Sequence, residues 1–284
     1  MVFGRLGVLG QMSTLGMSSA ASAGGGGGFS WTNAEGEAFA AAMSGTYSDA
    51  KLALLDTYIS NLKSGLTNGT NTWGGHDVLS LLFLDNATDA LRWFNSPATL
   101  MTNNGATHTP GEGYTGNGSS SYINSNYNPS TDGVQYTQNS ASMGLWVRSA
   151  GSNAAAAYAG LDVSAFIGRG SDVSELSQAG PNGGFSNNEV ALSTTTGLLG
   201  INRSGASAIQ LNVNGAQDSS DTDASSAPAN GTVAILAQND LTLGVRQFSN
   251  AQISIFRAGR SFTAAEWVDI HAADDALLTG WASA

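Results

Sequence analysis

The chain has 284 residues, of which only 11% are charged, against about 25% in an average soluble domain. Its formal net charge is -11 and its only two lysines are Lys51 and Lys63, so it has no basic surface that would recruit nucleic acid. It has no cysteine, which excludes disulfides and thiolate metal sites, and no run of about 20 apolar residues that could span a membrane.

The opening of the chain repeats with a period of three, because glycine or serine recurs at every third position from Gly4 to Gly16. Four apolar residues share this spacing: Leu6, Leu9, Met12 and Leu15. Neither a helix nor a strand could bury all four on one face, and five glycines follow at 24–28. We therefore predict that residues 1–28 are an extended anchoring peptide and linker, whose four apolar side chains insert into another protein. A cleavable signal peptide is the weaker alternative, because glycines interrupt its apolar region.

Residues 29–96 are predicted to form a small helical segment. A first amphipathic helix begins at Ser48, a good N-cap, and ends at Gly65. Its apolar face contains Leu52, Leu55, Tyr58, Ile59 and Leu62. The apolar stretch from Val78 to Leu84 is predicted as a second helix, which Asp77 could cap. We expect these short helices to pack against a β-rich body.

Residues 97–284 change to short β-type runs separated by turn residues, which is typical of an all-β sandwich or barrel. The predicted strands are 121–124, 143–149, 156–160, 164–168, 189–194, 197–202, 208–213, 233–238, 241–246 and 251–257. Asn214-Gly215 is the clearest hairpin turn, since both residues tolerate positive φ. None of these runs contains lysine, so we expect their edges to be bulged, covered or paired in an oligomer.

The C-terminus is predicted to form a helix that packs back on the sheets or on the early helices. The sequence from Thr263 to Glu266 matches a capping box. An apolar stripe follows it: Trp267, Ile270, Leu277, Leu278 and Trp281.

Three segments resemble parts of concanavalin A-like, laminin-G-type jelly rolls. Residues 113–128 resemble the first strand of such domains, 207–217 a hairpin that ends in an Asn-Gly turn, and 250–280 the last strand with a short terminal helix. Together with residues 138–149 and the opening "FGRLGVLG", they make the chain resemble bacteriophage and prophage virion proteins of the fibre, spike or decoration type. The resemblance implies a mainly β fold, a concanavalin A-like jelly-roll β-sandwich, located in the virion with portal, tail or capsid proteins as partners.

No sequence pattern indicates catalysis. Glycosidases that resemble this jelly roll place alternating acidic residues along one strand, because two carboxyl groups must flank the sugar bond. The chain lacks such a triplet, and its nearest acidic pairs are Asp172 with Glu175 and Asp274 with Asp275. Its three histidines are isolated, without the spacing of a metal site or a hydrolase: His76, His108 and His271. We expect no enzymatic activity and no cofactor.

Calcium is a minority hypothesis for the segment 218–223. It contains Asp218, Asp221 and Asp223, and laminin-G-like domains often bind calcium. The segment lacks the glycine and the distant glutamate of an EF-hand loop, so a flexible acidic turn is favoured.

Four tyrosines lie among Asn, Ser and Gly and are the candidate glycan-binding residues: Tyr114, Tyr122, Tyr127 and Tyr136. A flat ring can cover one face of a sugar while amides bond its hydroxyl groups. Core packing or subunit contact explains each tyrosine equally well.

We therefore expect a virion structural protein of the tail or head fibre or spike type, which is anchored by its N-terminus and attaches to host-surface glycans. Glycine at every third position lets three chains approach closely, which favours a trimer among the possible homo-oligomers. A capsid decoration or cement protein without a ligand is one alternative. A polysaccharide-degrading enzyme is another, less favoured one.

Overall fold

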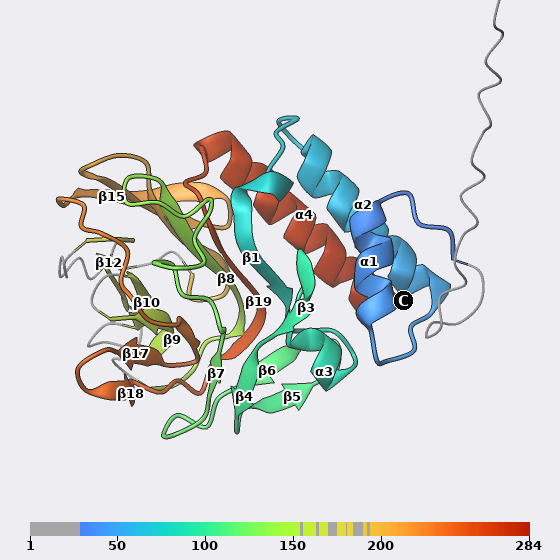
Figure 1. Ribbon diagram of the computed structural model, residues 1–284, viewed down its shortest axis with the longest axis horizontal. Coiled ribbons are helices and arrows are strands. Elements are labelled where there is room, and N and C mark those ends of the chain that lie inside the picture. The colour runs from blue at the N-terminus through green and yellow to red at the C-terminus, as the bar shows by residue number, and fades with distance from the viewer. Residues whose placement is uncertain are drawn as a thin grey trace, which may run out of the picture.

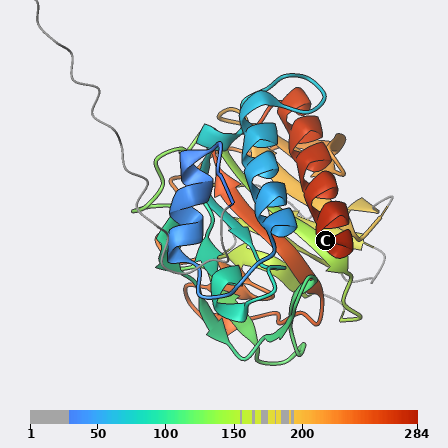
Figure 2. The ribbon, with the colours of Figure 1, turned by 90° about the vertical axis from the view of Figure 1, so that its right-hand side faces the viewer.

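The computed structural model describes residues 29–153, 156–162, 165–169, 175–179, 181–183, 190–191 and 194–284. Two β-sheets pack face to face, and helices cover the outer face of one of them (Figures 1 and 2). The predicted mainly β sandwich with a C-terminal helix is confirmed. The predicted anchoring peptide, with Leu6, Leu9, Met12 and Leu15, lies outside the described residues.

The first sheet, sheet A, runs β15, β14, β13, β8, β19, β1, β2, β3, with β6 pairing with β19 and β5 with β6. Its strands are β1 (His76–Leu81), β2 (Arg92–Trp93), β3 (Ser96–Leu100), β5 (Thr107–Thr109), β6 (Gly113–Thr115), β8 (Ala141–Ser149), β13 (Gly197–Arg203), β14 (Ala208–Val213), β15 (Ala216–Thr222) and β19 (Gln252–Gly259).

The second sheet, sheet B, runs β12, β11, β10, β9, β16, β7, β4, and β17 joins β9 to β18. Its strands are β4 (Thr102–Asn104), β7 (Tyr122–Asn124), β9 (Ala157–Leu161), β10 (Ala165–Arg169), β11 (Glu175–Ala179), β12 (Val190–Ala191), β16 (Ala234–Ile235), β17 (Gln238–Asp240) and β18 (Gly244–Arg246).

The helices are α1 (Ala34–Ala42), α2 (Asp49–Ser64), α3 (Ala87–Ala90) and α4 (Ala264–Ser283), with a 3-10 turn at Trp73–Gly75. The predicted ends of α2 are confirmed, because the Ser48 hydroxyl accepts a hydrogen bond from the Lys51 amide and Gly65 ends the helix at a φ of 69°. Both bonds of the capping box predicted at Thr263 and Glu266 form at the start of α4. Each helix in the described residues is too short or too polar to cross a membrane.

The helix predicted for Val78 to Leu84 is wrong. His76–Leu81 is strand β1, which pairs antiparallel with β19 and faces helices on one side and sheet B on the other. A central strand that is buried on both faces is a continuous apolar run, which local sequence does not distinguish from a short buried helix. The segment 29–96 is therefore not a separate helical unit, because it supplies β1 and β2 to sheet A.

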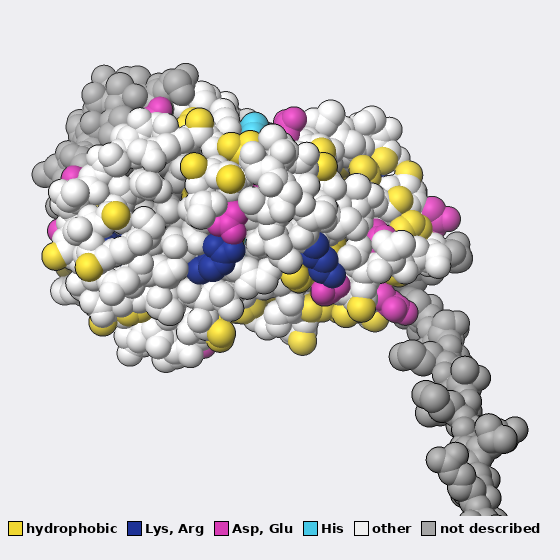
Figure 3. Space-filling view, turned by 90° about the horizontal axis from the view of Figure 1, so that it is seen from above, with side chains coloured by type: hydrophobic (Ala, Val, Ile, Leu, Met, Phe, Trp, Pro, Cys, Tyr) yellow, Lys and Arg dark blue, Asp and Glu magenta, His cyan; other side chains and the backbone are white. Residues whose placement is uncertain are grey.

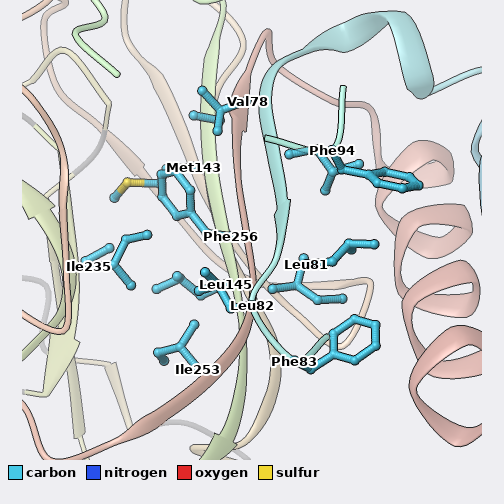
Figure 4. Packing of buried hydrophobic residues seen from close by; sticks show 14 of the residues in the cluster. Val78, Leu81, Leu82, Phe83, Phe94, Met143, Leu145, Ile235, Ile253 and Phe256 are labelled. Atoms are coloured by element: carbon cyan, nitrogen blue, oxygen red, sulfur yellow. The ribbon is translucent and has the colours of Figure 1, made fainter. Parts of the chain in front are cut away.

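The hydrophobic core lies on both faces of sheet A. Met143, Leu145 and Ile253 of sheet A meet Ile235 of sheet B between the two sheets (Figure 4). On the other face, Phe94 packs edge-on against Phe39 of α1, with ring centroids 4.7 Å apart. Sheet A thus has an apolar layer on each side, which explains the near-complete burial of its central strands.

Two glycines form a seat for Trp267 of α4. Gly144 of β8 pairs with Gly200 of β13, and both face the helices. A Cβ atom on Gly200 would lie 2.4 Å from the indole of Trp267, which is fully buried. The missing side chains allow α4 to approach the sheet closely.

A buried ion pair joins the same helix to the neighbouring strand. Arg257 of β19 donates to the Asp274 carboxylate of α4, and both side chains are fully buried. The Tyr58 hydroxyl of α2 donates to the same carboxylate at 2.8 Å. Burial, and then the negative charge of Asp274, raise the pKa of Tyr58 well above its usual 10, so the phenol stays a neutral donor. One carboxylate therefore ties together β19, α2 and α4.

Other aspartates with little solvent exposure hold loops by accepting backbone hydrogen bonds. Asp77, which was predicted to cap a helix, instead accepts from the amides of residues 134–136 and from the Tyr127 hydroxyl. Asp269 of α4 accepts from the amides of Thr67, Asn68 and Thr70. The same arrangement recurs at three further aspartates: Asp56, Asp89 and Asp240. These bonds fix loop positions in a chain that has few other charges.

Replacing Gly200 by Ala should reduce the free energy of unfolding by about 1–3 kcal/mol, because the added methyl group overlaps the Trp267 ring. Urea unfolding measures the change. Gly205→Ala is the matched control, since no atom lies within 4 Å of a Cβ built there, and should change stability by less than about 0.5 kcal/mol. Equal effects of the two variants would contradict the seat.

Asp274→Asn should destabilise the fold by about 3–5 kcal/mol, because it leaves the Arg257 charge buried without its counterion. The control is the next residue, where Asp275→Asn alters an exposed side chain and should cost less than about 0.5 kcal/mol. Thermal and urea unfolding of both variants test this. A small effect at Asp274 would show that the ion pair does not secure α4.

Asp269 should make the free energy of unfolding fall as the pH is lowered below about 4. Burial raises the pKa of this carboxyl group, but hydrogen bonds from Thr70, Asn68 and Thr67 outweigh it and lower the pKa from its ordinary 3.8. A lowered pKa in the folded state means that the stabilisation is present above the unfolded pKa and is lost as the pH falls through the folded pKa. Asp269→Asn should therefore lose less stability than the wild type between about pH 4 and pH 2 in urea unfolding. Equal slopes for both proteins would contradict this role.

Candidate functional site

An open groove of about 650 Å³ lies between β8 and the C-terminal half of α4. Its walls come from β8, from the segment that leads into β13, from the turn between β14 and β15, and from α4. The lining residues that carry a polar group or an aromatic ring are Trp146, Arg148, Thr194, Thr196, Asn214, His271, Asp275 and Thr279.

Strand alternation places the first wall of the groove. Gly144 and Trp146 project from the same face of β8, because side chains two residues apart share a face. Arg148 lies at a register shift between β8 and β19 and lines the groove beside Trp146. Gly144 lies under Trp267, whereas Trp146 and Arg148 lie further along the strand and remain half-exposed. The same strand therefore contributes to the core at one end and to the groove at the other.

Trp146 and His271 form a stacked aromatic pair across the groove, which we call the aromatic platform. Their ring centroids are 5.6 Å apart and their planes differ by 14°. His271 follows Trp267 by one helical turn on α4, so the seat that holds Trp267 also positions His271.

The predicted Asn214-Gly215 turn is confirmed, and it supports the platform from the side. Both residues have positive φ, at 50° and 81°. The Asn214 side-chain oxygen accepts from the Leu198 amide at 3.0 Å, which ties the turn to β13. A Cβ atom on Gly215 would lie 3.0 Å from the Cβ of His271, so the turn and α4 are in close contact.

The groove presents groups that can form hydrogen bonds and aromatic contacts. It offers an aromatic surface, one guanidinium group, one carboxylate, an amide and hydroxyl groups. Among the described residues that line the groove, Asp275 is the one carboxylate. In the described part of the chain, no group of three or more His, Asp or Glu side chains could hold a metal ion.

Three of the four predicted glycan-binding tyrosines are core residues. Tyr114, Tyr127 and Tyr136 are 1%, 0% and 4% exposed. The Tyr114 hydroxyl donates to the Ala87 carbonyl and the Tyr127 hydroxyl to Asp77. Rings buried in this way have no face to offer a sugar, so their assignment to a glycan site is wrong.

Tyr122 of β7 is half-exposed and lies beside Phe248, with ring centroids 6.3 Å apart. It belongs to sheet B, whereas the groove is on the helical side of sheet A. The polar neighbours of the four tyrosines suggested exposure. In the structure several of those neighbours, such as Asn117 and Ser121, instead bond to backbone amides or to one another.

The acidic segment predicted as a flexible turn is instead part of edge strand β15, which pairs with β14. An extended strand rises about 3.3 Å per residue, so Asp218 and Asp221 are spread along it by roughly 10 Å rather than gathered around one ion. The strand also contains a register shift opposite Leu211 and Asn212. Carboxylates and a bulge thus protect an edge that has no lysine.

The predicted trimer stays a prediction.

The residues that line the groove were not identified as a site from the sequence. From the sequence alone, Trp146 is not singled out, His271 is named only as an isolated histidine, and Asp275 is named only as part of an acidic pair. Two local signals were present: the alternation of Gly144, Trp146 and Arg148, and the spacing of His271 and Asp275 by one helical turn. Neither signal indicates that these faces of β8 and α4 lie side by side.

No family model matches the chain, and no curated protein matches it in sequence. Among solved structures, a mutant of Trypanosoma rangeli sialidase that displays trans-sialidase activity is 9% identical, with a TM-score of 0.56 over 81% of this chain and 39% of that chain. The binding domain of botulinum neurotoxin serotype D is 11% identical, with a TM-score of 0.46 over 71% of this chain and 51% of that chain. The first likeness shows a shared β-sandwich fold, and this chain spans well under half of the sialidase.

Proposed function

We propose that this protein is a carbohydrate-binding β-sandwich of a bacteriophage or prophage virion, which attaches through its N-terminal peptide and binds host-surface glycans without cleaving them. The resemblance of its sequence to virion fibre, spike and decoration proteins with a concanavalin A-like jelly roll supports the virion location. The apolar triplet spacing of Leu6, Leu9, Met12 and Leu15 supports an anchoring role for residues 1–28.

The observation that carries the glycan-binding proposal is the aromatic platform inside a groove of hydrogen-bonding side chains. Trp146 and His271 are both half-exposed, and their stacked rings offer a flat apolar surface. Asn214, Asp275 and Thr196 stand around it with donors and acceptors that suit sugar hydroxyls. Carbohydrate sites combine these two elements, because one face of a pyranose is apolar and its rim is polar.

The groove also favours binding over hydrolysis. Asp275 is exposed, and no second carboxyl group lies beside it among the described residues of the groove. The neighbouring Asp274 points away from the groove and into the buried ion pair with Arg257. The paired acids Asp274 and Asp275 therefore lie on different sides of α4 and cannot act together on one sugar bond.

Trp146→Ala should weaken binding of the full-length protein to a bacterial glycan by about tenfold or more, because it removes one half of the platform. A glycan array identifies the ligand, and titration calorimetry measures the affinity. Trp31→Ala is the control, since this half-exposed ring packs against Phe29 in the N-terminal helical region and should leave the affinity unchanged.

Three results would contradict the proposal. The wild-type protein could bind no glycan on the array, or Trp146→Ala could bind as tightly as the wild type. Sustained release of reducing ends from the bound polysaccharide would show that the protein is an enzyme.

A further inference from the structure

We infer that the groove selects acidic sugars, and that Arg148 binds the carboxylate of the sugar. This inference rests on the proposed glycan-binding function and adds the chemical class of the ligand.

The basis of the inference is that Arg148 has no ion-pair or hydrogen-bond partner among the residues that the structure describes. Every other lysine or arginine whose side chain the structure describes is engaged, and the prominent basic side chains on the face in Figure 3 lie beside acidic ones. Arg203 is buried and donates to backbone carbonyls, including that of Asp223 at 2.8 Å. The others form ion pairs with carboxylates: Lys51, Lys63, Arg92, Arg246, Arg257 and Arg260.

A free arginine is unexpected in a chain with 21 acidic and 10 basic residues, since carboxylates are abundant. Arg148 lies near the end of β8, a central strand of sheet A, where its neighbours Val147 and Ser149 both pair with β19. It is half-exposed and stands next to the aromatic platform in the groove. A guanidinium group in this position is available to a ligand.

The guanidinium group fits a carboxylate well, because its parallel N–H groups donate to both oxygens. A phosphate would fit the same donors, but it carries more negative charge. The net charge of -11 and the Asp275 carboxylate in the groove make a singly charged carboxylate the more favourable anion. The ligand class is therefore sugars with a carboxyl group, such as uronic and sialic acids.

Asp275 sets the orientation of the sugar in the groove. It lies on α4, whereas Arg148 lies on β8, so the two charges stand on different walls of the groove and form no ion pair within 4 Å in the structure. A sugar carboxylate is attracted to the β8 wall and repelled from the α4 wall, where Asp275 can accept hydrogen bonds from sugar hydroxyls. The aromatic platform between them contacts the ring of the same sugar.

The experiment compares each polysaccharide with its own neutral form. Polygalacturonate, alginate and polysialic acid are immobilised as they are and after chemical reduction of their carboxyl groups. The full-length protein should bind at least one native polymer about tenfold to a hundredfold more tightly than its reduced form. Raising the salt concentration should reduce this difference, because the groove is open to solvent.

Arg148→Gln should abolish the preference for the native polymer while leaving binding to the reduced polymer unchanged. Arg148→Lys should restore part of the preference, since it keeps the charge but not the paired donors. Arg246→Gln is the control, because this arginine lies on β18 in sheet B and pairs with Asp240. Urea unfolding checks that each variant is folded.

Two outcomes separate this inference from the proposed function. Equal, Trp146-dependent binding to native and reduced polymers would overturn the acidic selectivity and leave glycan binding intact. A preference that persists in Arg148→Gln would also overturn the role of Arg148. Failure to bind either form of any of the three polymers, together with an array that shows no ligand, would overturn both.

Discussion

The position of α4 depends on the buried ion pair between Arg257 and Asp274, and the groove depends on α4. Removing two charges from water is costly, and the pair is stabilising only with good geometry and further hydrogen bonds, which Tyr58 helps to supply. Because successive residues are turned by about 100° around a helix, fixing Asp274 toward the sheet also fixes the direction of its neighbours. Asp275 is left facing the groove, and His271, almost one turn earlier, stacks on Trp146.

Much of the fold could be predicted because its signals are local. Ser48, Gly65 and the capping box at Thr263 act within one helical turn, and the Asn214-Gly215 turn acts within one hairpin. Several predicted strands after residue 97 coincide with observed ones for the same reason, such as 143–149 with β8 and 208–213 with β14. The prediction is wrong at 233–238, which divides into β16 and the start of β17, and at 241–243, which form a turn. The helix prediction for Val78 to Leu84 is wrong because the burial of this stretch on two faces depends on β19 and the helices, which are far away in the sequence.

The candidate site was beyond prediction for a related reason. Polar neighbours were used as a sign of exposure for Tyr114, Tyr127 and Tyr136, but in the structure those neighbours satisfy their own hydrogen bonds in turns and the rings fill the core. Trp146 and His271 carry no mark that distinguishes them from core or surface residues until β8 and α4 are placed together. Only a contact between distant segments creates the groove.

The glycine seat under Trp267 also sets the width of the groove. One wall of the groove is a helix and the other is a sheet, so the gap between them follows the helix-to-sheet distance that Gly144 and Gly200 allow. A bulkier residue at either glycine would lift α4 and move His271 and Asp275 away from β8, without changing any residue that lines the groove. The width of the groove is thus set at two positions that do not line it.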